Sequence, residues 1–301
     1  MIINQLTNPS PMDKCAMLTK LNTNLVSIPQ PGYEREFCYC CYECNVCNSV
    51  VFGGSAVEAN NDKSSFLFQK QLIGDTISIK LYKDAAFLTD LNSNALGQFF
   101  NGIGANGLLV GYVLDWNLVF GAYGVGTYYV ETEYTIIGVS GTYTSQDFNL
   151  LPYSEEQANG TIRIEWTQNG TIQSNPIDFT GLNWYQSVRL RGSIVTLQPE
   201  LIQENYTTTD RRTTQIQSQI VEKWRLSTEL ICKELKDLIY CDLVLANSIK
   251  ISNFNLFQEL LIQKEVNVES LEELKVFQGN RNFAIAINFE DRVKNKLKRN
   301  C

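Results

Sequence analysis

Four Asn-Gly pairs occur in the middle of this chain, and they constrain its fold more than any other feature. They begin at Asn101, Asn106, Asn159 and Asn169. Tight β-hairpins need positive φ at the turn, and Asn-Gly supplies it. Between two of these turns lies TIRIEWTQ, Thr161–Gln168, whose β-branched and aromatic residues are typical of a strand, and TIQSNPIDF follows it. The sequence therefore predicts antiparallel hairpins, most clearly here.

Other runs of the same region have the same character. Asp75–Tyr82 (DTISIKLY) alternates isoleucine and leucine with polar residues, which is the period of a half-buried strand. Gly126–Gly138 and Tyr185–Leu197 have the composition of longer strands. Several strands at this spacing predict an antiparallel β-sandwich, jelly-roll-like domain over residues 66–205.

The flanking segments differ in composition. Residues 1–65 are rich in asparagine, proline and cysteine, and we expect an extended arm that packs mainly on other chains. Residues 206–301 mix strand-like runs with Cys232–Ala246, where apolar residues recur at helical spacing. The predicted fold class is therefore mainly β with α+β: a β-sandwich domain, a smaller α+β domain and an N-terminal arm.

The 301-residue chain contains no histidine. This excludes Ser-His-Asp and Cys-His catalysis and HExxH zinc proteases. A net charge of −7 argues against a nucleic-acid coat. Glycoside hydrolysis by two carboxylates and carboxylate-bound Mg²⁺ or Ca²⁺ stay open. The composition favours binding or assembly over catalysis.

Targeting signals are not evident. The first residues lack a basic segment followed by an apolar one, so we expect no secretory signal. The longest apolar stretch, Gly107–Leu114, is too short to span a bilayer. We therefore expect the chain to fold in a cytosol.

A cysteine cluster is the most distinctive chemical feature. It comprises Cys38, Cys40, Cys41, Cys44 and Cys47, and the C-x2-C spacing makes Cys38, Cys41, Cys44 and Cys47 candidate ligands for zinc or an iron–sulfur cluster. Structural zinc sites usually add a second C-x2-C pair about a dozen residues away, and this chain has none. We therefore expect no cofactor, with the cysteines as free thiols or as disulfides formed outside a reducing cell.

Other candidate sites have simple structural alternatives. Trp116, Trp166, Trp184 and Tyr185 could form a sugar-binding platform, but core packing is the favoured interpretation. Glu131 and Glu133 share a strand face and could act as an acid/base or calcium pair, although a solvated face explains them as well. The run GIGANG, residues 102–107, matches G-x-G-x-x-G, but a strand-like run follows it, so we interpret it as a hairpin turn.

The C-terminal end is basic. Arg292, Lys294, Lys296 and Lys298 lie in the run DRVKNKLKRNC. We assign them to an assembly interface with an acidic neighbour or a channel, because unpaired lysines are not buried in a core. A solvated strand or helix end is the alternative.

Two runs carry a resemblance to a known family. TGLNWYQSVRLRGSI (Thr180–Ile194) and YCDLVLANSIKISNFN (Tyr240–Asn255) resemble segments of virion proteins of crAss-like tailed phages of Bacteroidetes. The runs GAYGVGTYYVETEYTIIG and FEDRVKNKLKRN are similar in style. The resemblance covers residues 66–301 and leaves out the cysteine-rich arm. It implies a ring-forming collar or tail protein, commonly of twelve copies, and carries over no catalytic residue.

These observations predict a non-enzymatic virion structural protein made in the bacterial host cytoplasm. We expect a ring subunit of the phage collar or tail that helps connect the capsid portal to the tail and form the DNA channel. Expected partners are further copies in a twelvefold ring (sixfold as the alternative), adjacent portal, collar or tail proteins and, in passing, packaged DNA, but no membrane. The alternatives are a carbohydrate-binding or receptor-binding tail component and a cell-wall glycosidase.

Overall fold

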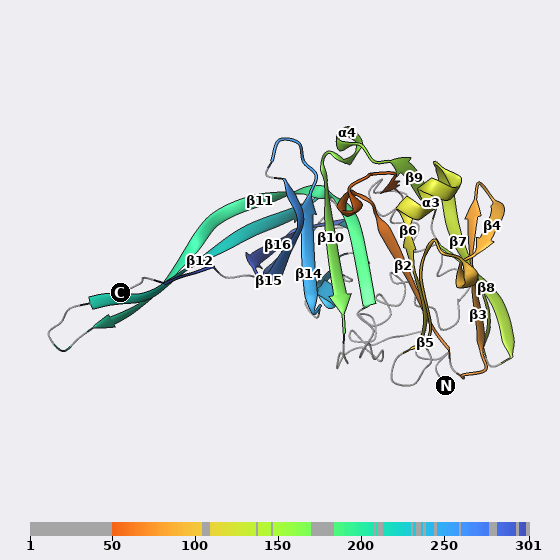
Figure 1. Cartoon of the computed structure of the whole chain (residues 1–301), viewed down its shortest axis with the longest axis horizontal. Coiled ribbons are helices and arrows are strands. Elements are labelled where there is room, and N and C mark those ends of the chain that lie inside the picture. Colours follow the sequence, from red (N-terminus) through yellow and green to blue (C-terminus); the bar gives the residue numbers. More distant parts are fainter. Residues whose placement is uncertain are drawn as a thin grey trace.

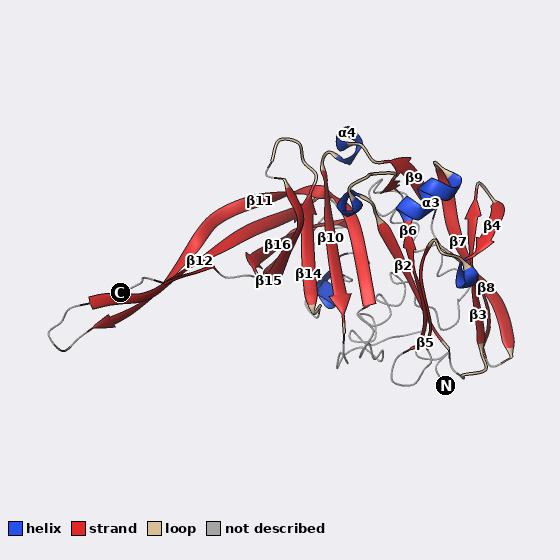
Figure 2. Ribbon diagram, in the orientation of Figure 1, coloured by secondary structure: helices blue, strands red, loops and turns tan. Residues whose placement is uncertain are grey.

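The computed structural model describes residues 50–298 with gaps at 71, 104–108, 137, 146, 170–183, 208, 210–212, 230, 233–235, 237–238, 244–245, 259, 277–281 and 293–294. Strands make up most of this part of the chain, and the helices are few and short (Figure 2). The prediction of a mainly β fold is therefore confirmed.

The first half of the described chain is a sandwich of two sheets. The larger sheet has the order β1-β9-β7-β3-β4, with β8 also paired to β7, and the smaller one has the order β2-β6-β5. Only β1 and β9 run parallel. The strands are β1 (Val50–Gly53), β2 (Lys63–Gln69), β3 (Thr76–Lys83), β4 (Ala86–Asp90), β5 (Gly97–Ile103), β6 (Leu109–Asp115), β7 (Gly126–Ile136), β8 (Val139–Thr144) and β9 (Phe148–Pro152).

Alternation along the strands builds the sandwich core. Ile77, Ile79 and Leu81 of β3 point inward and meet residues of the smaller sheet, among them Phe66 and Tyr112. Successive side chains of a strand point to opposite faces, so a polar residue between two apolar ones lies on the outer face. The sandwich predicted from this pattern is confirmed.

A helix that the sequence analysis did not assign follows β6. This helix, α3 (Trp116–Tyr123), begins after Asp115, whose side chain accepts a hydrogen bond from the Asn117 backbone N–H. Such a cap satisfies one of the free N–H groups of the first turn. Trp116 and Val119 are buried in the sandwich core. The other short helices of this half are the 3₁₀ turns η2 (Glu58–Asn60) and η3 (Leu91–Ser93), and α4 (Glu155–Ala158) leads to the second half.

The second half is a sheet that closes on itself, which we call the closed sheet. Six antiparallel strands pair in the cycle β10-β11-β12-β16-β15-β14-β10. They are β10 (Thr161–Gln168), β11 (Trp184–Thr207), β12 (Thr213–Thr228), β14 (Ser248–Asn253), β15 (Leu261–Val276) and β16 (Asn282–Asp291). The short strands β13 (Ile231–Cys232) and β17 (Asn295–Lys298) extend it.

The closed sheet has its own core. Ile162, Ile164 and Trp166 of β10 point inside together with the alternate apolar residues of the other strands. A π-helical turn, η4 (Ile239–Leu243), packs its two end residues against this core. The helix predicted over Cys232–Ala246 is tested only in part: Cys232 belongs to strand β13, Ile239–Leu243 is helical, and residues 233–235, 237–238 and 244–245 lie outside the described residues.

The predicted domain limits at residues 65 and 205 do not coincide with the ends of strands in the structure. Residue 205 lies inside β11, and the closed sheet uses strands on both sides of it. Residues 50–65, predicted to belong to the arm, contribute β1, η2 and the start of β2 to the sandwich. The run TIQSNPIDF lies outside the described residues. Within them, β10 pairs with β11 and β14.

Strands β11 and β12 continue beyond the closed sheet as a long two-stranded projection (Figure 1). From here on, "the arm" means this projection and not the N-terminal segment 1–65. It comprises residues 200–207 of β11, residues 213–221 of β12 and the short strand β17, which is paired to β12. It begins at a register shift between Leu197 and Glu200, where Pro199 interrupts the ladder. Proline has no N–H to donate and is found in sheets at such bulges.

Candidate functional site

The sandwich and the closed sheet meet at a polar interface. Residues of β10 and β11 that alternate with the core residues point outward, toward β2 and the turn before it. The Ser187 hydroxyl donates to the Lys63 carbonyl at 2.9 Å, and the Ser65 hydroxyl donates to the Tyr185 carbonyl at 2.5 Å. The site therefore lies between two separately folded cores.

Four charged side chains form a buried ion cluster at this interface. Asp62 of the sandwich lies between Arg163 and Arg189 of the closed sheet, with Nη–Oδ1 distances of 3.2 and 2.8 Å. Glu165 completes the cluster at 3.2 Å from Arg163. All four side chains are at most 7% exposed. Such a group is stable because two positive and two negative charges compensate each other.

The arginines hold their positions through further contacts. Arg163 also donates to the backbone carbonyls of Ala59 and Asn61. The Arg189 guanidinium lies over the rings of Phe52 and Phe254, 4.8 and 4.3 Å from their centroids. Planar guanidinium groups combine hydrogen bonding and ring stacking in this way. The cluster is therefore a rigid connection between the two cores.

These charges fix the protonation states. Burial raises the pKa of Asp62, but Arg189 and Arg163 outweigh it, so the pKa lies below its ordinary value. Burial lowers the pKa of Arg163, and Glu165 and Asp62 outweigh that effect in the other direction. Asp62 is thus held as the anion and Arg163 as the cation. A carboxylate that donates or accepts a proton in catalysis needs a pKa raised toward the working pH, whereas the pKa of Asp62 is lowered.

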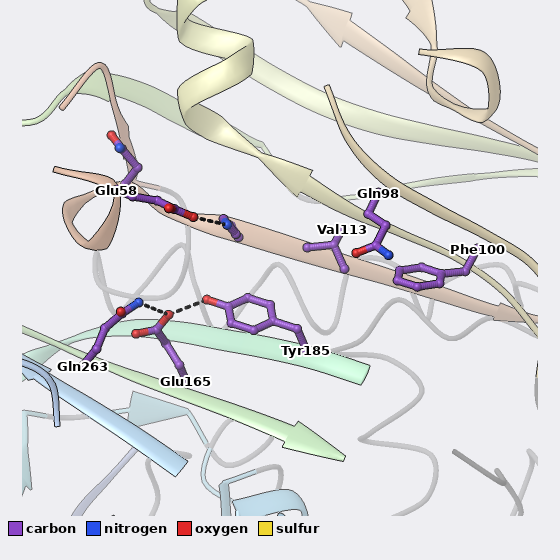
Figure 3. A pocket seen from close by; sticks show the side chains of 9 residues that line it. Glu58, Gln98, Phe100, Val113, Glu165, Tyr185 and Gln263 are labelled. Atoms are coloured by element: carbon purple, nitrogen blue, oxygen red, sulfur yellow. Dashed lines mark hydrogen bonds and ion pairs between the residues drawn. The ribbon is translucent and has the colours of Figure 1, made fainter. Parts of the chain in front are cut away.

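A pocket of about 260 Å³ opens beside the ion cluster, between the two cores (Figure 3). Its walls come from η2, β2, β5 and β6 of the sandwich and from β10, β11 and β15 of the closed sheet. The lining residues are Glu58, Asn61, Lys63, Gln98, Phe100, Val113, Glu165, Tyr185 and Gln263.

On the closed-sheet wall, Glu165 is held by three donors. Its Oε1 accepts from the Tyr185 hydroxyl at 2.7 Å and from Gln263 Nε2 at 3.3 Å (Figure 3). Its Oε2 accepts from Arg163. Burial, and next the charge of Glu165, raises the pKa of Tyr185 well above its ordinary value, so this hydroxyl keeps its proton. The wall is preorganised before any ligand arrives.

On the sandwich wall, the charge of Lys63 is compensated. Its Nζ lies 3.1 Å from Glu58 and 3.4 Å from Asp115. Burial lowers the pKa of Lys63, but these two carboxylates outweigh it and raise the pKa above its ordinary value. Gln98 and Phe100 of β5 complete this wall.

Of the predicted site residues that the structure describes, only Tyr185 lines this pocket. Cys38, Cys40, Cys41, Cys44 and Cys47 lie outside the described residues, and the expected absence of a cofactor there stays a prediction. Within the described part, no three histidine, cysteine, aspartate or glutamate side chains form a metal-binding group.

The basic C-terminal residues are partly described. Arg292 is exposed, and its backbone N–H donates to the Glu265 carbonyl. Lys296 and Lys298 belong to β17 and pair with Gln219 and Gln217 of the arm. Lys294 lies outside the described residues. The assembly role of all four stays a prediction.

The predicted sugar platform is not formed by the tryptophans. Trp116, Trp166 and Trp184 are at most 2% exposed and pack inside the molecule. Trp184 contacts Gly111 and Leu67 at the junction of the two cores. Core packing is therefore the correct interpretation, and only Tyr185 of this set lines the pocket.

Two further candidates have structural explanations. Glu131 accepts a hydrogen bond from Tyr82, and Glu133 pairs with Lys80 at 2.5 Å on the outer face of the sandwich. The run GIGANG begins with the last two residues of β5, and its other residues lie outside the described part of the chain. The next described element is β6, which pairs antiparallel with β5, and not a helix. The hairpin interpretation of this run is confirmed.

Sequence reasoning missed the ion cluster and the pocket. The sequence does contain a pattern for three of the four charged residues of the cluster. Arg163 and Glu165 alternate with apolar core residues in one strand, and Arg189 does so in the next. Charged residues on the outer face of a strand usually face water, so this pattern did not suggest an interface. The partner Asp62 lies 101 residues before Arg163, and no local pattern connects them.

Comparisons with known proteins add no assignment. No protein-family model matches this chain, and no curated protein matches it. Among the helices that the structure describes, none is long and apolar enough to cross a membrane.

Proposed function

We propose that this chain is a non-enzymatic structural protein of a phage virion, a ring subunit of the collar or tail. In that role it helps connect the capsid portal to the tail and line the DNA channel, with twelve copies per ring and six as the alternative. The observation that carries the proposal is the arm, which extends away from both cores (Figure 1). The resemblance of Thr180–Ile194 and Tyr240–Asn255 to phage ring proteins gives the biological setting.

The arm carries apolar side chains that no core covers. Leu201 and Ile202 of β11 are 55% and 41% exposed, and Ile220, paired opposite Leu201, is 37% exposed. Because Leu201 and Ile202 are neighbours in a strand, they point to opposite faces of the arm. The arm has two long strands with the short β17 paired beside Gln217–Ile220, and so small a sheet is only marginally stable in water by itself. An arm of this kind gains stability by packing on another chain.

A second apolar patch lies on the loop between β14 and β15. Leu256, Phe257 and Leu260 are 50%, 94% and 68% exposed. Two different apolar patches on one subunit favour head-to-tail contacts, and such contacts give a ring when the rotation closes. We therefore assign the arm of one subunit to the β14–β15 loop of the next copy.

The interior of the molecule supports a scaffold rather than an enzyme. The buried carboxylates Asp62 and Glu165 are compensated by arginines and by Tyr185. This arrangement joins the two cores and holds Asp62 as the anion, because the arginines lower the pKa of Asp62, so Asp62 is not suited to transfer a proton. A rigid body with a projecting arm is suited to a repeated assembly.

Mass photometry and negative-stain electron microscopy of the purified protein test the proposal. We expect closed rings at about 10 µM, because an interface of more than about 1,000 Å² gives a specific assembly. The double variant Leu201→Lys/Ile220→Lys and the single variant Phe257→Lys should both give monomers, since each places a charge in the same contact.

Leu72→Lys is the matched control. Leu72 is 56% exposed but lies in the β2–β3 loop of the sandwich, away from both patches. This variant should assemble like the wild type. A wild-type protein that is monomeric under these conditions, or rings that survive both sets of substitutions, would contradict the proposal.

A further inference from the structure

The pocket between the two cores is not needed for a ring contact, and its chemistry is specific. We infer that it binds a neutral polyhydroxylated ring, the terminal residue of a saccharide. This inference is independent of the proposed ring, because it depends on residues of η2, β2, β5, β10, β11 and β15 and not on the arm.

The pocket offers mixed donors and acceptors at short range. Carboxylate oxygens of Glu58 and Glu165 accept, the Lys63 ammonium donates, and the side-chain amides of Gln98 and Gln263 can do both. Neighbouring hydroxyls of a sugar need partners of this mixed kind, since each hydroxyl donates once and accepts as well. The Gln98 side chain makes no hydrogen bond to any other described residue, so its amide is free for a ligand.

The charges of the pocket select a neutral ligand. Glu165 is paired with Arg163 at 3.2 Å, and Glu58 is paired with Lys63 at 3.1 Å. Because each charge already has its counterion, an added anion or cation would enter uncompensated. The described residues also include no group of metal-binding side chains here. A ligand with many hydroxyls and no net charge adds no uncompensated charge to the pocket and needs no metal ligands.

Size and shape agree with one sugar ring. The volume of about 260 Å³ lies just below the roughly 300–1,000 Å³ of pockets for drug-sized molecules. The Phe100 ring and Val113 lie opposite the polar wall of Glu165, Tyr185 and Gln263 (Figure 3). A pyranose has one face of C–H groups and a rim of hydroxyls, which fits an apolar surface facing a polar one.

The backbone conformation of Gln263 also supports a binding site in this pocket. Its φ is 48°, in the left-handed region that residues other than glycine, asparagine and aspartate seldom adopt. The position is a bulge in the β14–β15 ladder, and Ser252 accepts the Gln263 N–H. Residues held in such strained conformations cluster at functional sites. Here the strain places the Gln263 amide at the pocket wall beside Glu165.

Ligand-observed saturation-transfer NMR on the full chain tests the inference. The probes are glucose, galactose, mannose and N-acetylglucosamine, each free and as its methyl glycoside, at about 10 mM, because ligands of this size bind weakly. We expect at least one of them to bind. The charged analogues glucuronic acid and glucose 6-phosphate should not bind.

Variants locate the binding site. Gln98→Ala and Gln263→Asn should each weaken binding by about tenfold, the effect of one lost hydrogen bond. Asparagine tolerates the left-handed backbone, so Gln263→Asn shortens the side chain without adding strain. Gln157→Ala, on the exposed face of α4, is the control and should bind like the wild type.

The outcomes separate the possibilities. Equal binding of a free sugar and its methyl glycoside supports a chain terminus as the natural ligand, whereas binding of reducing sugars alone overturns that assignment. No binding by any neutral sugar, preferential binding of a charged analogue, or full binding by Gln98→Ala overturns the inference. Gln98→Ala should leave the oligomeric mass unchanged, so failure here does not affect the ring proposal.

Discussion

At the scale of single residues, the ion cluster shows why buried charges occur in sets. Asp62 accepts hydrogen bonds from Arg163, Arg189 and the Phe52 backbone N–H. Removing one member would leave the others buried and uncompensated, which typically costs about 3–5 kcal/mol. The cluster therefore makes correct docking of the two cores depend on every one of its charges.

The pH dependence of stability follows from Asp62. Its pKa in the folded state lies below the ordinary value of 3.8, so the folded state favours the anion. This stabilisation is complete well above pH 3.8 and is lost as pH falls below that value toward the lowered pKa. Thermal unfolding followed from about pH 7 to about pH 3 should show this loss.

Two variants make that prediction specific. Asp62→Asn should lower the stability at neutral pH by about 3–5 kcal/mol and flatten the decline toward acid. Asp147→Asn changes an exposed carboxylate and should keep the wild-type profile. A profile for Asp62→Asn as steep as that of the wild type would contradict the assignment.

At the scale of elements, two strands depart from regular pairing where the structure needs it. The shift around Pro199 marks the point where β11 leaves the closed sheet and becomes the arm. Strand β6 carries Gly111, and a Cβ there would lie 2.8 Å from the Trp184 ring and 3.0 Å from Leu67. The absence of a side chain at Gly111 lets β6 of the sandwich approach β11 of the closed sheet.

A pair of glycine substitutions tests this contact. Gly111→Ala should destabilise the protein by about 1–3 kcal/mol, because the Trp184 ring must move. Gly121→Ala is the control: its Cβ would meet no atom within 4 Å, and it lies inside α3, where alanine is favoured by about 0.5–1 kcal/mol. Chemical denaturation should therefore show opposite signs, and equal changes would refute the packing argument.

At the scale of the whole molecule, two cores fold around separate apolar clusters and meet through polar contacts and two small apolar clusters. The sandwich core and the closed-sheet core share none of their buried apolar residues. The link between them consists of the ion cluster, the Trp184 contact and the hydrogen bonds of β2 with β11. Cooperative unfolding of the whole chain depends on this link.

Scanning calorimetry should report that dependence. We expect one transition for the wild type and two separated transitions for Arg189→Met, because the variant breaks the ion cluster, the charged part of the link, and leaves both cores intact. Arg225→Met is the matched control. Arg225 forms an ion pair with Glu272 at the surface, and such a pair contributes at most about 1 kcal/mol to stability. A single transition for Arg189→Met would show that apolar contacts alone couple the cores.

The sequence by itself determined the elements whose signals are local. Alternation over residues 75–82 predicts a strand that matches β3, and Thr161–Gln168 is β10 to the residue. Asn159-Gly160 is a turn with Gly160 at a φ of 78°, but it joins α4 to β10 and does not form the predicted hairpin. Period and turn chemistry involve neighbours in the chain, so one sequence suffices to recognise them.

Only the tertiary structure decided how these elements combine. Closure of the second sheet depends on β12 pairing with β16, and the pocket depends on Gln98 of β5 meeting Gln263 of β15. Of the helix predicted at Cys232–Ala246, the described residues show the π-helical turn Ile239–Leu243, whereas Cys232 at its start pairs with β16 as a strand. Such contacts connect residues far apart in sequence, and their free energy comes from packing and charge compensation in three dimensions, which no local pattern encodes.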